Sequence, residues 1–242
     1  MRSERAIVFL VGAVQFVNIV DFMMVMPLGP DFAVALGVPL EHIGIVGGAY
    51  TLAAAVAGLA LSPVLDRFDR RVALGACMGG LALGTVMGGF ATSMTTLVLA
   101  RVLAGAFGGP ATSVALSIVA DVIPVERRGR AMGAVMGAFS VASVLGVPAG
   151  LELSRLATWR APFFAVGGAG LLIAGLAVAA LPRLTGHLEG PRRGTRAELG
   201  TLAREPASWT GLATTALLTF SGFLLIPHLS AVNLFVSLGV VL

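Results

Sequence analysis

The sequence has little charge and no lysine. Of its 242 residues, 12% are charged and 57% are hydrophobic, and the mean hydropathy is +0.96. Soluble domains average about 25% charged residues, so this chain lacks the charge needed to cover a soluble globule of its size. The composition therefore excludes a soluble enzyme and a disordered chain, and it indicates an integral membrane protein.

Residues that bind metals or act as nucleophiles are also scarce. Cys77 is the single cysteine, so no disulfide can form within the chain. The three histidines, His42, His187 and His228, lie far apart in the sequence and show no metal-ligand spacing. The sequence has neither an H-E-x-x-H metal motif nor a G-x-S-x-G nucleophile motif. We therefore expect no metal site, no cofactor and no enzymatic catalysis.

Long apolar runs separate short clusters of charge. A helix needs about 20 mostly apolar residues to cross a bilayer. Six runs have this length, with a seventh beginning near Trp209, and the six lie at roughly 6–26, 43–61, 72–91, 97–119, 131–151 and 161–181. The runs are continuous and do not alternate in polarity, which favours helices over the strands of a membrane barrel.

The 16 basic residues are all arginines, and their positions predict the orientation of these spans. If the spans alternate in direction, the arginines of the N-terminus, of the 2–3 and 4–5 loops and of the segment after span six share one side of the membrane. The opposite loops carry only Arg155 and Arg160. Because short cytoplasmic loops carry an excess of arginine, we expect a cytoplasmic N-terminus. The sequence pI of about 10.9 thus reflects topology, and we expect no nucleic-acid partner.

We expect three parts along the chain. Residues 1–182 form a six-span bundle, 183–208 a polar cytoplasmic linker, and 209–242 a seventh span that begins an incomplete second bundle. In the linker, Thr195 and Glu198 fit a helix capping box, which predicts a short amphipathic helix at the membrane surface. Charges followed by paired glycines recur around spans 2–3 and 5–6, and this pattern favours a three-plus-three inverted repeat.

Two charged residues lie within the apolar runs: Asp21 in the first span and Arg101 in the fourth. Counted at about 1.5 Å per residue, both lie roughly 8 Å below the outer surface of the membrane. A charge inside a span is costly and usually faces a cavity or a partner. The equal depth permits an Asp21–Arg101 pair, in which Asp21 is linked to proton or substrate binding. The alternative is that each side chain reaches the outer interface separately.

The loop after the second span carries a run of charges and a leucine: Asp66, Arg67, Arg70, Arg71 and Leu74. It resembles the loop signature of the major facilitator superfamily, with Ser62 and Asp69 in place of the two glycines of that pattern. The resemblance implies a charge cluster with Asp121, at the cytoplasmic end of the fourth span, that latches the outward-facing state. The alternative interpretation is membrane anchoring by the arginines alone, which requires neither Asp66 nor Asp121.

The fourth span contains Arg101, Gly105 and Gly108, which match the family motif R-x-x-x-G-x-x-G. In that family the arginine is associated with proton transfer. The end of the first span, from Asp21 to Pro30, also resembles that of proton-coupled efflux members. The resemblance thus implies that Asp21 and Arg101 belong to a proton-linked site.

In the fifth span, Gly146, Pro148 and Gly150 are similar to the antiporter motif G-x-x-x-G-P-x-x-G. The sequence departs from that motif because Val147 separates the glycine from the proline. Close helix packing is the alternative role of these glycines. The two roles are compatible, since the proline and its glycines would weaken the helix where it has to bend.

These resemblances imply a secondary transporter that exports a small molecule in exchange for protons by alternating access. Its expected location is the bacterial inner membrane, and its expected partners are lipid, a small-molecule substrate and protons. Uptake or facilitated diffusion is the alternative within the family, and a nontransporting remnant or membrane scaffold is the alternative outside it. Because the resemblance covers only the first bundle and one helix of the second, we expect a fragment, a truncated product or a chain that needs a second copy.

Overall fold

A computed structural model of the chain describes residues 2–185, 205–206, 208–214 and 216–217. The chain divides into two compact units, residues 1–190 and 191–242. In the second unit, residues 206, 208–214 and 216–217 are helical. The predicted linker helix around Thr195 and Glu198 and most of the predicted seventh span lie outside the described residues. The three-part division of the chain therefore stays a prediction.

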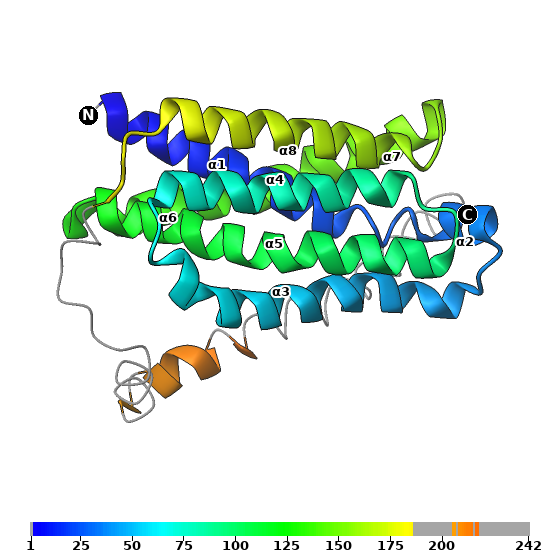
Figure 1. The fold of residues 1–242 in the computed structure, drawn as a ribbon, viewed down its shortest axis with the longest axis horizontal. Coiled ribbons are helices and arrows are strands. Elements are labelled where there is room, and N and C mark those ends of the chain that lie inside the picture. The colour runs from blue at the N-terminus through cyan, green and yellow to red at the C-terminus, as the bar shows by residue number, and fades with distance from the viewer. Residues whose placement is uncertain (1, 186–204, 207, 215, 218–242) are drawn as a thin grey trace, which may run out of the picture. The chain divides into compact units, whose positions relative to one another are not determined.

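The described part of the first unit is helical and contains no strand. Six of its segments are long and apolar enough to cross a membrane, the fifth being formed by α6, η2 and α7 together, and the predicted all-helical, six-span bundle is confirmed (Figure 1). The elements are α1 (Arg2–Met23), α2 (Gly29–Leu36), η1 (Leu40–His42), α3 (Ile43–Leu65), α4 (Arg70–Gly89), α5 (Met94–Val122), α6 (Val125–Val141), η2 (Ala142–Gly146), α7 (Val147–Leu156) and α8 (Ala161–Ala180).

The first span is shorter than its apolar run. The run was expected to extend to about residue 26, but α1 ends at Met23 and a turn leads into α2. Proline lies in the first turn of α2, where the missing N–H needs no partner, and Gly37, with φ 65°, caps the helix after Leu36. The apolar count alone therefore overestimated the span and missed the short helix that follows it.

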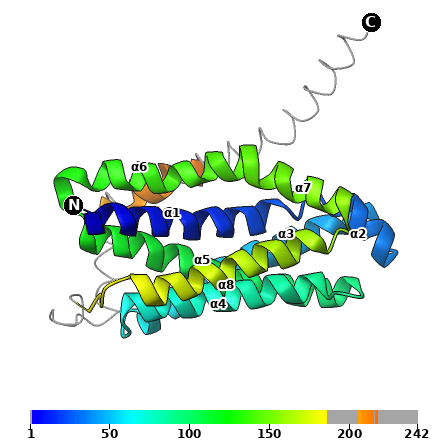
Figure 2. The ribbon, with the colours of Figure 1, turned by 90° about the horizontal axis from the view of Figure 1, so that it is seen from above.

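Small residues allow the helices to approach one another closely. The principal pairs are α3 with α5, α4 with α5 and α8, and α1 with α6. A Cβ atom added at Gly84 would lie 2.5 Å from the backbone nitrogen of Ala104, and one added at Gly109 would overlap the carbonyl oxygen of Ala54. Within a bilayer such contacts, and not the exclusion of water, bring helices together. Figure 2 shows α6 and α7 running in succession along one side of α1.

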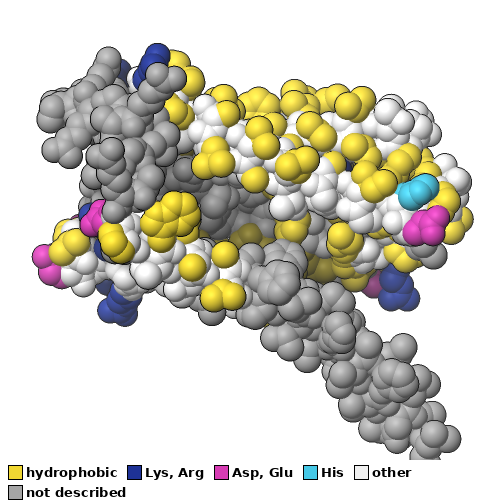
Figure 3. All heavy atoms as spheres, turned by 90° about the horizontal axis from the view of Figure 1, so that it is seen from below, with side chains coloured by type: hydrophobic (Ala, Val, Ile, Leu, Met, Phe, Trp, Pro, Cys, Tyr) yellow, Lys and Arg dark blue, Asp and Glu magenta, His cyan; other side chains and the backbone are white. Residues whose placement is uncertain are grey.

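The outside of the bundle is apolar along its length. Large hydrophobic side chains such as Leu52, Val56 and Leu59 on α3 are mostly exposed. Figure 3 shows hydrophobic side chains over this face and charged side chains gathered at the two ends. The start of α1 and the α3–α4 and α5–α6 connections lie at the same end (Figure 1). The arginine-rich connections therefore share one end, as the alternating spans predicted.

Candidate functional site

An ion pair between α1 and α5 lies inside the bundle. Arg101 Nη1 donates to both carboxylate oxygens of Asp21, at 2.9 and 3.0 Å, and Nη2 donates to the main-chain oxygen of Asp21 at 3.1 Å. Both side chains are 0% exposed. The structure therefore brings together the two residues that the sequence placed at equal depth. It does not support the alternative in which each side chain reaches the interface separately.

Two neighbouring helices complete the surroundings of this pair. The Thr85 hydroxyl of α4 lies 2.7 Å from Asp21 Oδ1 and 2.8 Å from the Leu81 carbonyl oxygen. The Tyr50 ring of α3 lies against the guanidinium, with Arg101 Cζ 4.5 Å from the ring centroid. A buried ion pair is stable only when further polar contacts replace the lost water. These contacts join four helices at one point.

A second set of polar side chains extends from Tyr50 along α1. The Tyr50 hydroxyl donates to Asn18 Oδ1 at 2.6 Å, and Asn18 Nδ2 donates to the carbonyl oxygen of Gly108 and to Thr112 Oγ1, both at 2.8 Å. Thr112 in turn donates to Gln15 Oε1 at 3.2 Å. We call these four side chains, Gln15, Asn18, Tyr50 and Thr112, the polar chain.

Sequence reasoning missed the polar chain, although one signal for it was present. Gln15, Asn18 and Asp21 recur at a spacing of three within an otherwise apolar span. Residues three or four apart lie on one face of a helix, so this spacing indicates a polar stripe on α1. No comparable spacing points to Tyr50, which reaches the site from a different helix.

The glycines of the fourth-span motif make room for Tyr50. A Cβ atom at Gly105 would overlap the Tyr50 carbonyl oxygen, and one at Gly108 would overlap the Tyr50 hydroxyl and lie 3.0 Å from Asn18 Oδ1. Arg101, Gly105 and Gly108 thus all face Tyr50 from α5. These two glycines therefore allow α3 to pack closely on α5, at the same site as the arginine.

The fifth-span motif coincides with an irregular helical turn. Residues Ala142–Gly146 form a π-helix, and Pro148 follows it after Val147 in the first turn of α7. A Cβ atom at Gly146 would overlap the Val20 side chain of α1, whereas one at Gly150 would reach Pro162 only at 4.0 Å. Gly146 therefore allows close packing beside the turn, and Gly150 does so much less. A π-turn next to a proline is a common place for a helix to bend.

The predicted latch residues are brought together in part. Arg70 forms ion pairs with Asp66 and, through Nε at 3.3 Å, with Asp121. Arg71 instead pairs with Asp69 at 3.9 Å, and Arg67 makes no ion pair among the described residues. The cluster that joins the α3–α4 loop to the end of α5 therefore consists of Asp66, Arg70 and Asp121.

Asp69, which replaces a glycine of the family pattern, has a clear structural role. Its Oδ1 accepts hydrogen bonds from the backbone N–H of Arg71 at 2.9 Å and of Leu184 at 3.1 Å. It therefore caps α4 and holds the segment that follows α8. Asp69 has φ −54°, a value open to any residue, so the loop turns without the glycine of the pattern.

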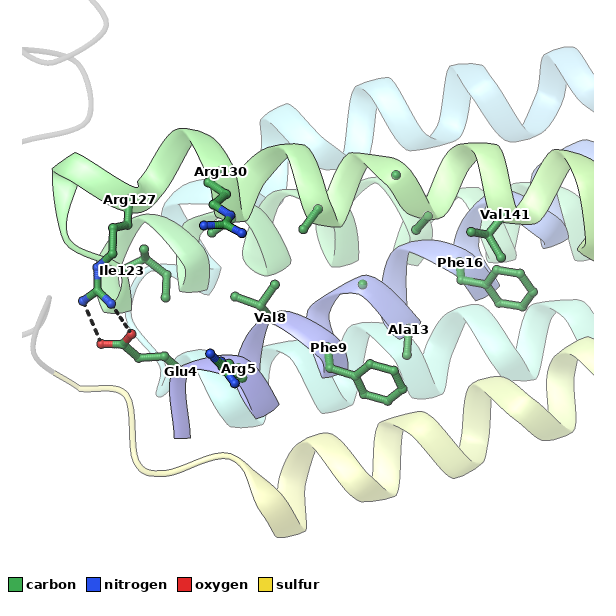
Figure 4. A pocket seen from close by; sticks show the side chains of 15 residues that line it. Glu4, Arg5, Val8, Phe9, Ala13, Phe16, Ile123, Arg127, Arg130 and Val141 are labelled. Carbon is green, nitrogen blue, oxygen red and sulfur yellow. Dashed lines mark hydrogen bonds and ion pairs between the residues drawn. The ribbon is translucent and has the colours of Figure 1, made fainter. Parts of the chain in front are cut away.

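A groove of about 970 Å³ lies between α1 and α6 (Figure 4). Apolar residues, including Phe9, Phe16 and Val141, line most of it. Charged side chains lie at one end, where Arg127 pairs with Glu4 at 3.1 Å and Arg5 and Arg130 lie nearby. Within the part of the chain that the structure describes, no group of histidine, cysteine or acidic residues is placed to hold a metal.

Comparisons with known proteins agree with this architecture. The sequence pattern of the Major Facilitator Superfamily matches residues 11–241. The chain is 32% identical to a chloramphenicol resistance protein of Streptomyces lividans, over 60% of this chain and 37% of that protein. It is 28% identical to the inner membrane transport protein YdhP of Escherichia coli, over 85% of this chain and 52% of that protein.

Two further comparisons concern the fold of the chain and its length relative to similar proteins. The chain is 24% identical to the purine ribonucleoside efflux pump NepI of Escherichia coli, over 78% of this chain and 47% of that protein. The inward-facing, unoccupied structure of a bacterial homologue of the human lysosomal transporter Spinster superposes with a TM-score of 0.66 at 20% identity, over 81% of this chain and 47% of that one. The chain thus spans about half the length, or less, of these relatives. It is a multi-pass membrane protein, and it belongs to the Major Facilitator Superfamily of transporters.

Proposed function

We propose that this chain forms the proton-linked half of a secondary transporter that exports a small molecule in exchange for protons. The observation that carries the proposal is the fully buried ion pair of Asp21 and Arg101. We further propose that the protein lies in a bacterial inner membrane with its N-terminus in the cytoplasm, since the arginine-rich connections share one end of the bundle.

The pair links protonation to the arrangement of the helices. Breaking a buried pair by removing one partner costs about 3–5 kcal/mol, because the other charge is left without compensation. A proton on Asp21 removes the charge that Arg101 faces, and with it the strongest connection between α1 and α5. The protonated and deprotonated forms therefore favour different packings of these helices, which is the requirement for coupling proton flow to alternating access.

We propose that the Asp66–Arg70–Asp121 cluster acts as a latch at the end of the bundle that is farther from the Asp21–Arg101 pair. It joins the α3–α4 loop to α5, the helix that also carries Arg101. A change in the position of α5 would therefore reach this cluster. Asp66 and Asp121 remain partly exposed, at 53% and 39% of the side chain, so water can solvate both carboxylates when the cluster opens. The Arg70 side chain is only 11% exposed, so it has to move with the loop as its partners leave.

Two of the relatives, a chloramphenicol resistance protein and a purine ribonucleoside efflux pump, favour the export of a small molecule. Chloramphenicol and a purine ribonucleoside are therefore used as probes for this chain. Since alternating access needs two bundles, we propose that transport also requires a second bundle, supplied by a longer chain or by a second copy.

The test measures accumulation of radiolabelled chloramphenicol and of radiolabelled adenosine in cells that produce the chain, with and without a protonophore. We expect reduced accumulation of at least one probe, abolished by the protonophore and by Asp21→Asn. Asp31→Asn is the matched control, because Asp31 is an exposed acid on α2. Equal accumulation in cells with and without the wild-type chain would overturn export by copies of this chain, and the second bundle would then have to come from a longer chain. Export that survives Asp21→Asn would overturn the role of the pair.

A further inference from the structure

Tyr50 holds a fixed place beside the ion pair although no resemblance or motif points to it. It is 5% exposed and reaches the pair from α3, a helix that contributes nothing else described to that point. Its ring lies against the Arg101 guanidinium at 4.5 Å, while its hydroxyl donates to Asn18 at 2.6 Å. The ring and the hydroxyl therefore have separate partners on α5 and α1.

The position of the ring is fixed from several sides. Gly105 and Gly108 leave space on α5 that only a residue without a side chain can leave. The ring of Phe22 lies 5.5 Å from that of Tyr50, centroid to centroid. The bond to Asn18 sets the direction of the hydroxyl, and Asn18 is itself held by Gly108 and Thr112. Tyr50 thus forms a rigid surface for the guanidinium.

Arg101 depends on this surface because its other contacts come from one residue. Its two terminal nitrogens donate to Asp21, and its buried Nε has no hydrogen-bond partner among the described residues. A guanidinium is attracted to the negative face of an aromatic ring, most strongly when water is excluded. When Asp21 loses its charge, the Tyr50 ring and the main-chain oxygen of Asp21 are therefore the contacts that still hold the guanidinium.

We propose that Tyr50 is a positioning residue that keeps Arg101 in place while Asp21 is protonated. This inference rests on the proposed proton-linked role of Asp21. In the protonation step, one proton from water binds the Asp21 carboxylate and forms the neutral acid. Arg101 keeps its charge and stays against the ring. When the proton leaves, the guanidinium is already beside the carboxylate, and the ion pair forms again without a prior movement of the Arg101 side chain.

The helices packed against α1 bring no competing charge to this level of the membrane. Within its apolar run α5 carries Arg101 alone. α4 carries Arg70 and Arg71 in its first turn, at the end of the helix far from Thr85, and beyond them Cys77 is its titratable group. Residues 131–151 of the fifth span and the whole of α8 contain no titratable side chain. Among the described residues, Arg101 is therefore the charged group that faces the Asp21 carboxylate, and the Tyr50 ring lies against Arg101.

The test uses dicyclohexylcarbodiimide, an apolar reagent that modifies protonated carboxyl groups, and needs no transported substrate. The purified full chain in detergent is treated between pH 5 and pH 9, and modification of Asp21 is quantified by peptide mass spectrometry. We expect Tyr50→Leu to shift the midpoint of modification upward by about one pH unit, since an unheld Arg101 stabilises the carboxylate less. Tyr50→Phe keeps the ring and should restore the wild-type midpoint within about 0.3 unit.

Phe163→Leu is the control for the loss of a buried ring, because Phe163 is 0% exposed and packs against Trp159. It should leave the midpoint unchanged. A wild-type midpoint that Tyr50→Leu does not move, or that Phe163→Leu moves equally, overturns the role of Tyr50 and leaves the proton site standing. Failure to modify Asp21 in both the wild type and Tyr50→Leu overturns the proton site and the inference together.

Discussion

Replacing Gly105 with alanine tests whether close contact between α3 and α5 builds the site. The new Cβ would overlap the Tyr50 carbonyl oxygen and lie 3.0 Å from the Tyr50 Cα and carbonyl carbon. Ordinary contacts begin at 3.4 Å, so the two carbon contacts alone require the backbones to separate by about 0.4 Å, and the overlap with the oxygen requires more. A backbone cannot rotate out of the way as a side chain can. Overpacking of this kind costs about 1–3 kcal/mol.

The expected result is a lower melting temperature for Gly105→Ala, measured by circular dichroism of the purified chain in detergent. For a chain of this length 1 kcal/mol corresponds to about 2–4 °C, so we expect a decrease of roughly 5 °C. The decrease is the net of two opposed effects. Alanine is the better helix former by about 1 kcal/mol, and the contact with Tyr50 has to outweigh that gain.

Gly79→Ala is the matched control, because Gly79 lies in α4 and a Cβ there would meet nothing within 4 Å. It should leave the melting temperature unchanged or raise it by a few degrees, since only the helix propensity changes. Equal melting temperatures for the two variants would refute the reasoning. They would mean that α3 and α5 adjust to the added methyl group without loss, and that the motif glycines do not fix the position of Tyr50.

Two more predictions concern the ends of the bundle. Asp69→Ala removes the cap of α4 and the bond to Leu184, so the free energy of unfolding should fall by about 0.5–2 kcal/mol in a denaturant titration. Glu41→Ala, at an exposed acid, is the control and should change that free energy little. The proposed orientation places Thr158 outside the membrane and Phe68 in the cytoplasm. An impermeant maleimide should therefore label Thr158→Cys in intact spheroplasts and Phe68→Cys only after permeabilisation. The native Cys77 is buried and should not react. The reverse labelling pattern would invert the proposed orientation.

The sequence was informative about spans because hydropathy and arginine placement depend only on position along the chain. It also placed Asp21 and Arg101 at one depth, since depth follows from counting residues along a helix. The direction in which each side chain points around its helix is set by packing, so the pairing itself needed the structure. For the same reason Thr85 and Tyr50, which come from two other helices, could not be assigned to the site.

The α3–α4 loop shows a different limit to what the sequence can predict. The family pattern gives Arg67, Arg70 and Arg71 as equal members of a latch, yet only Arg70 reaches Asp121. A loop positions each arginine separately, and neighbouring residues point in different directions. Against the family pattern Asp69 is the loss of a glycine, but its short acidic side chain suits a helix cap. The same substitution thus removed one feature of the pattern and supplied another.

The π-helix at Ala142–Gly146 bears on how the fifth span can change in evolution. A π-turn holds one more residue than the α-turn that it replaces. Elsewhere in a packed span, an insertion or deletion of one residue rotates everything beyond it by about 100° and moves each side chain to another face. Here the wide turn separates α6, which packs on α1, from α7, which packs on α8. The π-turn can absorb the insertion or deletion of one residue. The span can therefore change in length while α6 keeps its contact with α1 and α7 keeps its contact with α8.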